Sequence, residues 1–123
     1  VSVITYGLMV HHCIEAARSV ADKGISVEVV DLRTLVPMDK DTIVSSVKKT
    51  GKALIVHEDT KTGGVGGEVA AVIAEEAFDY LDAPVIRLAG PDVPAMPFSP
   101  PLEAMFMLDT DKIAAAIRKM ASY

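Results

Sequence analysis

The sequence predicts an α/β fold, a three-layer α/β/α domain built on a mainly parallel sheet of about four strands. Two patterns support this prediction. Four short apolar runs alternate along the chain with segments whose apolar residues recur at helical spacing. The apolar runs are continuous rather than alternating, as in strands that helices cover on both faces. Because crossovers between parallel strands are almost always right-handed, we expect one domain over residues 1–123 with the strand order 2-1-3-4.

The first half of the chain predicts two strand–helix units. The first strand is the β-branched run at residues 1–6, and a helix at residues 8–23 follows it. This helix is expected to turn one apolar stripe inward, made of Val10, Cys13, Ile14, Ala17 and Val20. The second strand is expected at residues 26–31. Asp39 then serves as the N-cap of a second helix, which ends at Gly51.

The second half of the chain predicts two further units. A third strand at residues 53–57 leads through a glycine-rich loop into a helix at residues 66–80. The fourth strand is expected at residues 84–88, and the last helix begins at Asp109. The inward faces of the two helices carry Val69, Val72, Ile73, Ala77 and Tyr80 in the first, and Ile113, Ala116, Ile117 and Met120 in the second.

Residues 89–107 show no regular period. Proline recurs there at every third position, at residues 91, 94, 97 and 100, a spacing typical of polyproline conformation. Such a segment could bind a proline-reading module. Its apolar residues instead favour an arm that packs on its own domain or on a neighbour: Met96, Phe98, Met105, Phe106 and Met107.

Composition restricts the partners. The chain has 12 Lys+Arg against 17 Asp+Glu, a formal net charge of −5, which disfavours nucleic acid and favours a basic partner. The single Cys13 excludes an internal disulfide and fits a reducing cytoplasm. No apolar run reaches the ~18 residues that span a bilayer, and we see no signal peptide. Because the chain begins at Val1 inside an expected strand, we expect a piece of a longer polypeptide.

The strand order places a topological switch point between the first and third strands, where open α/β sheets gather ligands. Its rim is expected to carry Tyr6, Gly7 and Leu8 after the first strand, and His57, Glu58 and Asp59 after the third. The last three offer an acid and a base, so general acid/base catalysis is one hypothesis. No matched nucleophile or set of metal ligands accompanies them. Adjacent His11 and His12 lie about 100° apart on a helix and do not easily chelate one ion.

The glycine-rich loop at residues 63–67 matches neither a dinucleotide fingerprint nor a phosphate loop. It could hold an anion at a helix N-terminus, or it could be a turn that lets backbone approach a partner subunit closely. Gly66, Gly67 and Glu68 are therefore candidate crevice or interface residues. Arg33 could likewise clamp a carboxylate or phosphate, or pair with a local acid such as Asp31 or Asp39.

An acidic patch ends the third expected helix, formed by Glu75, Glu76, Asp79 and Asp82. Negative charge there opposes the helix dipole. The patch is either a solvated face or a docking surface for a basic partner.

Five stretches of the chain carry a resemblance to a known family: ITYG at 4–7, HHCIEAA at 11–17, VVDLRTLVPMD at 29–39, KTGKALIVHED at 49–59, and GGEVAAVIAEEAFDYLDAPVIRLAGPDVPAMPFSP at 66–100. Together they resemble the C-terminal, transketolase-type domain of the β subunits of 2-oxo acid dehydrogenase complexes. The resemblance covers essentially the whole chain in order and spacing. The run RLAGPDVPAMPFSP is more similar to branched-chain members than to pyruvate or acetoin members.

The resemblance implies oxidative decarboxylation of a 2-oxo acid, with transfer of the acyl group to a lipoyl group. It also implies that thiamine diphosphate and Mg²⁺ are bound outside this fragment, by an α subunit and the N-terminal half of β. No catalytic, cofactor-binding or metal-binding residue is therefore expected in this chain. The expected cellular location is the cytoplasm of a bacterium or archaeon, or the mitochondrial matrix of a eukaryote, with the cytoplasm favoured.

The role that the resemblance implies for this domain is assembly. The domain joins β to a second β within an α₂β₂ heterotetramer, and it docks the basic subunit-binding domain of the lipoyl acyltransferase core. Asp82 and the C-terminal carboxylate of Tyr123 match that docking site. No nucleic acid or membrane is expected as a partner.

Other functions remain open at this stage. The chain could belong to a pyruvate or acetoin dehydrogenase β subunit. It could be a small regulatory module that binds an anion at residues 63–67. It could also be a self-sufficient enzyme built on His57, Glu58 and Asp59, which requires turnover by this chain alone.

Overall fold

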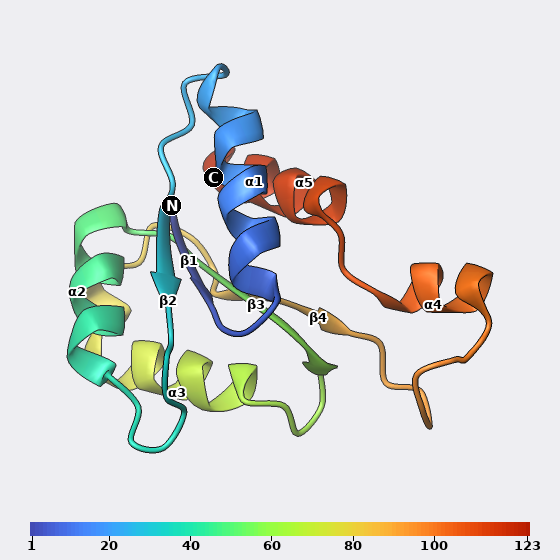
Figure 1. Ribbon diagram of the computed structural model, residues 1–123. Helices are drawn as coiled ribbons and strands as arrows, with labels where there is room; N and C mark the ends of the chain where they lie inside the picture. The colour runs from blue at the N-terminus through green and yellow to red at the C-terminus, as the bar shows by residue number, and fades with distance from the viewer.

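The structure, a computed structural model, describes residues 1–123 and contains one four-stranded parallel sheet with the order β2-β1-β3-β4 (Figure 1). The strands are β1 (Ser2–Thr5), β2 (Glu28–Asp31), β3 (Ala53–Thr60) and β4 (Ile86–Gly90). The α-helices are α1 (Met9–Ala21), α2 (Lys40–Thr50), α3 (Gly66–Glu76), α4 (Pro100–Phe106) and α5 (Thr110–Ala121), and one 3₁₀ helix, η1 (Phe78–Tyr80), follows α3. The predicted fold class and strand order are confirmed.

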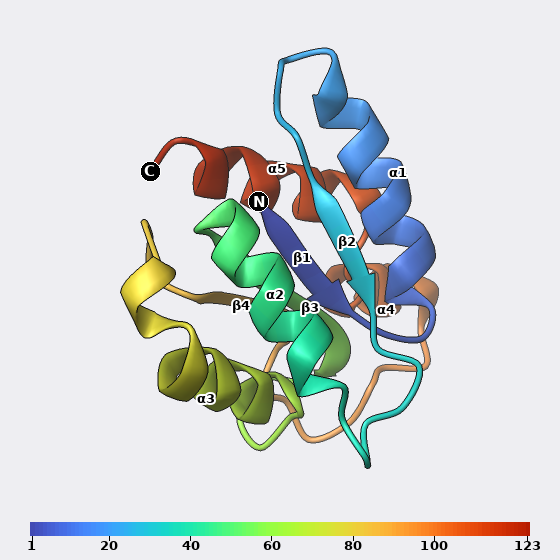
Figure 2. The same ribbon diagram turned by 90° about the vertical axis from the view of Figure 1, so that its left-hand side faces the viewer.

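Two apolar cores lie on opposite faces of the sheet. Helices α1 and α5 cover one face, and α2 and α3 cover the other (Figures 1 and 2). Successive strand residues point to opposite faces, so Leu54 joins the first core and Ile55 the second. Both side chains are almost completely buried. This two-sided burial explains why the strand sequences are apolar without alternation.

The predicted ends of α2 and the start of α5 are confirmed by their caps. The Asp39 carboxylate accepts a hydrogen bond from the backbone N–H of Thr42 at 3.0 Å, and Gly51 closes α2 with a φ of 70°. The Asp109 carboxylate caps α5 in the same way, accepting from the backbone N–H of Lys112 at 2.7 Å. None of the helices combines the length and the apolarity that crossing a bilayer requires.

The third predicted helix is wrong at its end. Helix α3 ends at Glu76, and Ala77 leaves helical conformation with a φ of −136°. The chain then continues as η1, whose three residues per turn break the 3.6-residue register. Tyr80, predicted to face inward, is therefore 52% exposed. Strand β3 is longer than predicted, because an irregularity after His57 lets Thr60 pair with Gly90.

The buried stripe of α1 also differs from the prediction. Cys13 and Val20 are buried as expected, but Met9 and Ala16 complete the stripe, while Val10, Ile14 and Ala17 are only half-buried. Helix α5 packs alongside α1, so the stripe is turned toward α5. On α5, Ala114 is buried in the position expected for Ala116, which is half-buried.

Residues 89–107 contain a helix that the sequence did not predict. Helix α4 begins after Ser99 with two prolines in its first turn, where a missing N–H costs nothing. No residue of α4 is buried. The two ends of the segment contact the domain: residues 89 and 90 belong to β4, and Met107 packs against the α1/α5 core. The predicted arm that packs on its own domain or on a neighbour stays a prediction for the exposed middle of the segment.

Candidate functional site

The switch point between β1 and β3 brings together two of the predicted residues. Thr5 pairs in register with Val56, so the residues that follow them, Tyr6 just after β1 and His57 within β3, lie side by side. Their rings stack, with centroids 6.2 Å apart and an angle of 12° between the planes. The two side chains meet at the predicted switch point, although β3 continues three residues beyond His57.

His57 lies beneath the glycine-rich loop and is completely buried. Neither of its ring nitrogens makes a hydrogen bond. A Cβ atom at Gly66 would collide with its Nε2 atom, and a Cβ atom at Gly64 would lie 2.7 Å from its Cε1 atom. The two glycines thus allow the start of α3 to close over the imidazole. The close approach that the loop permits is to a side chain of this chain.

Burial lowers the pKa of His57, and the negative charge of Asp59 offsets only part of that shift. The imidazole is therefore neutral at pH 7. Burial, with the charges of Asp59 and Glu58, raises the pKa of the Tyr6 phenol, which stays protonated. A sealed, neutral imidazole has no access to a substrate, so this arrangement does not favour the acid/base hypothesis.

The remaining predicted rim residues do not form one crevice. Asp59 is exposed, and its carboxylate accepts a hydrogen bond from the backbone N–H of Thr60 at 2.7 Å. Glu58 is half-buried, and Glu68 is exposed in the first turn of α3. Five surface depressions lie beside β2, α1, α2 or η1, and none of them is lined by His57, by these acids or by the glycine-rich loop. At the start of α3 the negative charge of Glu68 lies near the positive charge of Arg87, whose Nη1 atom donates to the Lys61 carbonyl at 2.9 Å.

Gly7 and Arg33 lie instead in a groove between α1 and β2. The Arg33 side chain is 86% exposed, and its Nε atom lies 2.5 Å from Oδ2 of Asp31. The structure thus matches the simpler interpretation of Arg33, in which it pairs with a local acid. An exposed pair of this kind adds little to stability.

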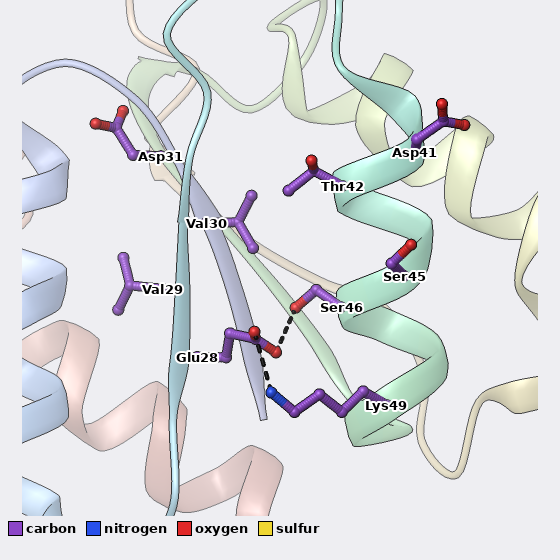
Figure 3. Close-up of a pocket in the computed structure, with 9 residues that line it drawn as sticks. All are labelled: Glu28, Val29, Val30, Asp31, Asp41, Thr42, Ser45, Ser46 and Lys49. Atoms are coloured by element: carbon purple, nitrogen blue, oxygen red, sulfur yellow. Dashed lines mark hydrogen bonds and ion pairs between the residues drawn. The ribbon is translucent and has the colours of Figure 1, made fainter.

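A polar depression between β2 and α2 was not predicted (Figure 3). At its inner end the Glu28 carboxylate accepts hydrogen bonds from Ser46 Oγ at 3.1 Å and from Lys49 Nζ at 3.2 Å. Ser46 Oγ also lies 2.6 Å from Ser2 Oγ on β1. Ser46 sits on the inward stripe of α2, and a serine at an apolar position was the one available sequence signal. Because these groups satisfy one another, the cluster stabilises the docking of α2 on the sheet.

The structure contains no group of three or more His, Cys, Asp and Glu side chains arranged to hold a metal ion. The Nδ1 atom of His12 lies 3.3 Å from Thr110 Oγ1, which links α1 to α5. Burial raises the pKa of the Cys13 thiol to about 11, so the thiol is protonated at pH 7. Cys13 is thus core packing, as the sequence indicated.

The two candidate docking residues lie near the same short segment. The backbone N–H of Asp82 donates to the Gly51 carbonyl at 2.8 Å, and Lys52 Nζ donates to the Ala121 carbonyl at 3.1 Å. Asp82 therefore lies against Gly51, and the end of α5, two residues before Tyr123, lies within reach of the Lys52 side chain. We call the exposed surface around Asp82 the acidic corner; it consists of Glu75, Glu76, Phe78, Asp79, Tyr80 and Asp82. Lys48 lies at its border, 5.0 Å above the Tyr80 ring.

Comparison with known proteins gives consistent relatives. The chain is 52% identical over 123 residues to the 2-oxoisovalerate dehydrogenase subunit beta of Bacillus subtilis (strain 168), covering 100% of this chain and 38% of that protein. It is 44% identical over 120 residues to the mitochondrial pyruvate dehydrogenase E1 component subunit beta of Dictyostelium discoideum, covering 98% of this chain and 33% of that protein. The chain thus spans between a third and two-fifths of the length of these relatives.

A solved structure agrees with the sequence relatives. The chain superimposes on a split-gene transketolase, described as an inactive beta4 tetramer, with a TM-score of 0.84 and 29% sequence identity, covering 98% of this chain and 39% of that one. The family profile for the transketolase C-terminal domain matches residues 1–113. With homologues that are β subunits of 2-oxo acid dehydrogenases, and with the parallel sheet described above, the chain belongs to the transketolase C-terminal domain family.

Proposed function

We propose that this chain is the assembly and docking domain of the β subunit in the decarboxylating component of a branched-chain 2-oxo acid dehydrogenase complex. The observation that carries the proposal is the 52% identity over the whole chain to a 2-oxoisovalerate dehydrogenase β subunit. The pyruvate dehydrogenase relative from Dictyostelium discoideum reaches 44%. A higher identity to the branched-chain relative supports that substrate class over pyruvate.

In this proposal thiamine diphosphate and Mg²⁺ are bound by an α subunit and by parts of β outside these 123 residues. The residues at the switch point do not fit the cofactor, because the start of α3 is closed over the buried His57 and none of the depressions described above opens there. A diphosphate needs accessible N–H donors in an open site. We therefore assign no step of the decarboxylation to a side chain of this domain.

The domain's own task in the proposal is to hold chains together. One surface joins a second β subunit within an α₂β₂ heterotetramer, and the β4 tetramer of the similar transketolase subunit supports the capacity of this fold for self-association. The acidic corner and the C-terminal carboxylate dock the basic subunit-binding domain of the lipoyl acyltransferase core. Phe78, 69% exposed, adds apolar area to that corner.

The physical reason for docking at this corner is charge. Exposed carboxylates accept charge-assisted hydrogen bonds from Arg and Lys, and opposite charges steer the encounter of the two surfaces. The corner holds Glu75, Glu76, Asp79 and Asp82. Salt screens such contacts over about 10 Å at 0.1 M ionic strength, so docking is expected to weaken as salt rises.

The test measures binding of the assembled α₂β₂ enzyme to the acyltransferase core by titration calorimetry. Asp82→Ala combined with a C-terminal extension is expected to weaken binding about tenfold at low salt, equivalent to ~1.4 kcal/mol. Asp22→Ala, which removes an exposed acid at the far end of α1, is the matched control and is expected to leave affinity unchanged. Unchanged affinity of the Asp82 variant at low salt would contradict the docking role.

A further inference from the structure

Strand β2 is one edge of the sheet, and its outer side carries unpaired backbone groups. The backbone N–H groups of Glu28 and Leu32 donate to carbonyls of residues 1–5, at 2.9 Å and 2.8 Å, so both point toward β1. In a parallel pair only alternate residues bond to the same neighbour, so the N–H and C=O groups of Val29 and Asp31 point away from the sheet. No strand of this chain pairs with that side. The β2 edge therefore offers backbone donors and acceptors to an incoming strand.

Helices α1 and α2 flank this edge without covering it. In Figure 2, β2 lies between α1 and α2, and no ribbon crosses in front of it. Figure 3 shows how its side chains alternate: Glu28 and Val30 project toward α2, and Val29 and Asp31 project to the other side. A strand added to the edge continues this alternation, so its successive side chains lie next to α2 and α1 in turn.

The depression on the α2 side is polar and acidic. It has a volume of about 470 Å³ and is lined by three acids, Glu28, Asp31 and Asp41, against one cation, Lys49. Glu28 is paired with Lys49, and Asp31 is paired with Arg33 outside the depression. Asp41 has no ion-pair partner. The unpaired carboxylate favours a basic side chain on the α2 side of an added strand.

The depression on the α1 side is more apolar. It is the groove between α1 and β2 described above, and its volume is about 700 Å³. We call it the α1–β2 groove; its apolar residues are Val10, Ile14, Val29 and Leu32, and it also contains the Asp31–Arg33 pair. Because that acid and that base neutralise each other, the groove leaves no single charge for a ligand to match. Its apolar wall favours an aliphatic side chain on the α1 side of an added strand.

Apart from being short, β2 lacks the features that normally protect an edge strand. Such strands are blocked by proline, by a bulge or by an unpaired charge on the strand. Residues 28–31 contain no proline, they pair with β1 in unbroken register, and each of their two acids is paired with a base. Since the strand has only four residues, an added strand gains few hydrogen bonds, and side-chain contacts decide which sequence is accepted.

We propose that the β2 edge is a docking site for an extended peptide segment of a partner protein, in which basic and aliphatic side chains alternate. The segment adds to the sheet by pairing with the backbone of Val29 and Asp31. Its basic side chains lie beside Asp41, and its aliphatic side chains enter the α1–β2 groove. The inference goes beyond the proposed function, because the acidic corner with Asp82 lines neither of the two depressions.

The test titrates a blocked hexapeptide of alternating valine and lysine into the isotope-labelled 123-residue chain and follows the amide signals by nuclear magnetic resonance. Saturable binding below about 1 mM is expected. The amide signals of Val29 and Asp31 are expected to shift most, because their N–H groups acquire acceptors. A peptide with glutamate in place of lysine is expected to bind about tenfold more weakly. Shifts confined to the acidic corner, or no saturable shift at β2, would overturn the proposal.

Two N-methylated peptides test the backbone pairing. One carries N-methyl groups on its lysines and the other on its valines, and an added strand directs only one of these two sets of N–H groups toward β2. One peptide is therefore expected to bind about tenfold more weakly than the other, because it loses its hydrogen bonds to the edge. Loss with the lysine set indicates parallel addition, and loss with the valine set indicates antiparallel addition. Equal binding of the two would contradict strand addition.

A charge reversal tests the side-chain preference. Asp41→Lys is expected to weaken binding of the lysine peptide about two- to fivefold and to strengthen binding of the glutamate peptide. Asp22→Lys is the matched control: it reverses an exposed acid that lines neither depression and is expected to change neither affinity. Circular dichroism checks that both variants are folded. An Asp41→Lys variant that prefers the lysine peptide as strongly as the native chain does would contradict the proposal.

Discussion

His57 combines complete burial with two ring nitrogens that make no hydrogen bond. Adding a proton to such a ring places an unpaired charge in a dry site, which is why burial lowers the pKa of His57 in the folded state. In the unfolded chain the imidazole keeps its ordinary pKa of 6.5. Below that pH the unfolded chain therefore binds a proton that the folded chain does not.

Stability is accordingly expected to fall as pH decreases through 6.5, until the lower folded-state pKa of His57 is reached. The measurement is the free energy of unfolding by urea at several pH values between about 7 and 5. His57→Leu is expected to remove most of the slope in this range, since it removes the proton-binding group. His11→Gln, on an exposed histidine, is the control and should keep the slope. A slope that persists unchanged in His57→Leu would contradict the assignment.

The glycines at positions 66 and 67 allow a matched comparison of packing. Gly66→Ala places a methyl group against Nε2 of His57 and is expected to destabilise the fold by about 1–3 kcal/mol. Gly67→Ala meets nothing nearer than Arg87 at 3.8 Å, and is expected to stabilise the fold by up to about 1 kcal/mol through helix propensity. Urea unfolding of the two variants measures the difference. Equal effects would mean that α3 does not close over the imidazole.

The sequence showed the glycine-rich loop and the histidine, but it did not show that one covers the other. Periodicity and caps report on residues a few positions apart in one element. The contact between His57 and Gly66 joins a strand end to a helix start, and its sequence signal is only that both residues sit near the switch point. The pairing of Arg33 with Asp31 could be predicted from the sequence, because the two residues are only two positions apart.

At the scale of elements, the turn that ends α2 also positions the acidic corner. Gly51 has a φ of 70°, and a Cβ atom there would collide with the Asp82 carboxylate. Gly24 has a similar φ of 74°, with nothing within 4 Å of the Cβ position. The two glycines thus share a backbone requirement and differ in what surrounds them.

Gly24→Ala is therefore expected to cost about 1–2 kcal/mol from backbone strain alone. Gly51→Ala is expected to cost more, because the methyl group also displaces Asp82. The double variant Gly51→Ala with Asp82→Ala is expected to recover the excess. Thermal unfolding of the native chain, Gly51→Ala, Asp82→Ala and the double variant gives the coupling energy between the two positions. An excess that is absent, or that survives removal of the Asp82 side chain, would show that Gly51 does not fix the position of that carboxylate.

Elements with strong periodicity were accessible from the sequence, and elements shaped by tertiary contacts were not. Asp39, Gly51 and Asp109 marked helix ends correctly, because capping is local. The prediction made helix α3 too long. The change from α3 to η1 has no proline or glycine between residues 76 and 80 that would have marked it in the sequence. Helix α4 was missed because a proline-rich segment with no inward face lacks the apolar period by which helices are recognised.

For the molecule as a whole, the fold class and strand order followed from the number and type of apolar runs. The candidate site followed less well, because the residues predicted on one rim divide between the Tyr6–His57 stack and the α1–β2 groove. The sequence predicts that a residue lies at the carboxyl end of a strand, but it does not predict whether glycine backbone covers the side chain of that residue. The depressions beside β2, α1, α2 and η1 do not include the packed switch point.

The central claim is that this domain assembles the enzyme while cleavage of the carbon–carbon bond takes place on other parts of it. The most direct measurement is decarboxylation of a branched-chain 2-oxo acid, and of pyruvate for comparison, in the presence of thiamine diphosphate and Mg²⁺. We expect no turnover by the 123-residue chain alone, and turnover that prefers the branched-chain substrate by the complete α₂β₂ enzyme. Turnover by the isolated chain in proportion to its concentration would contradict the account.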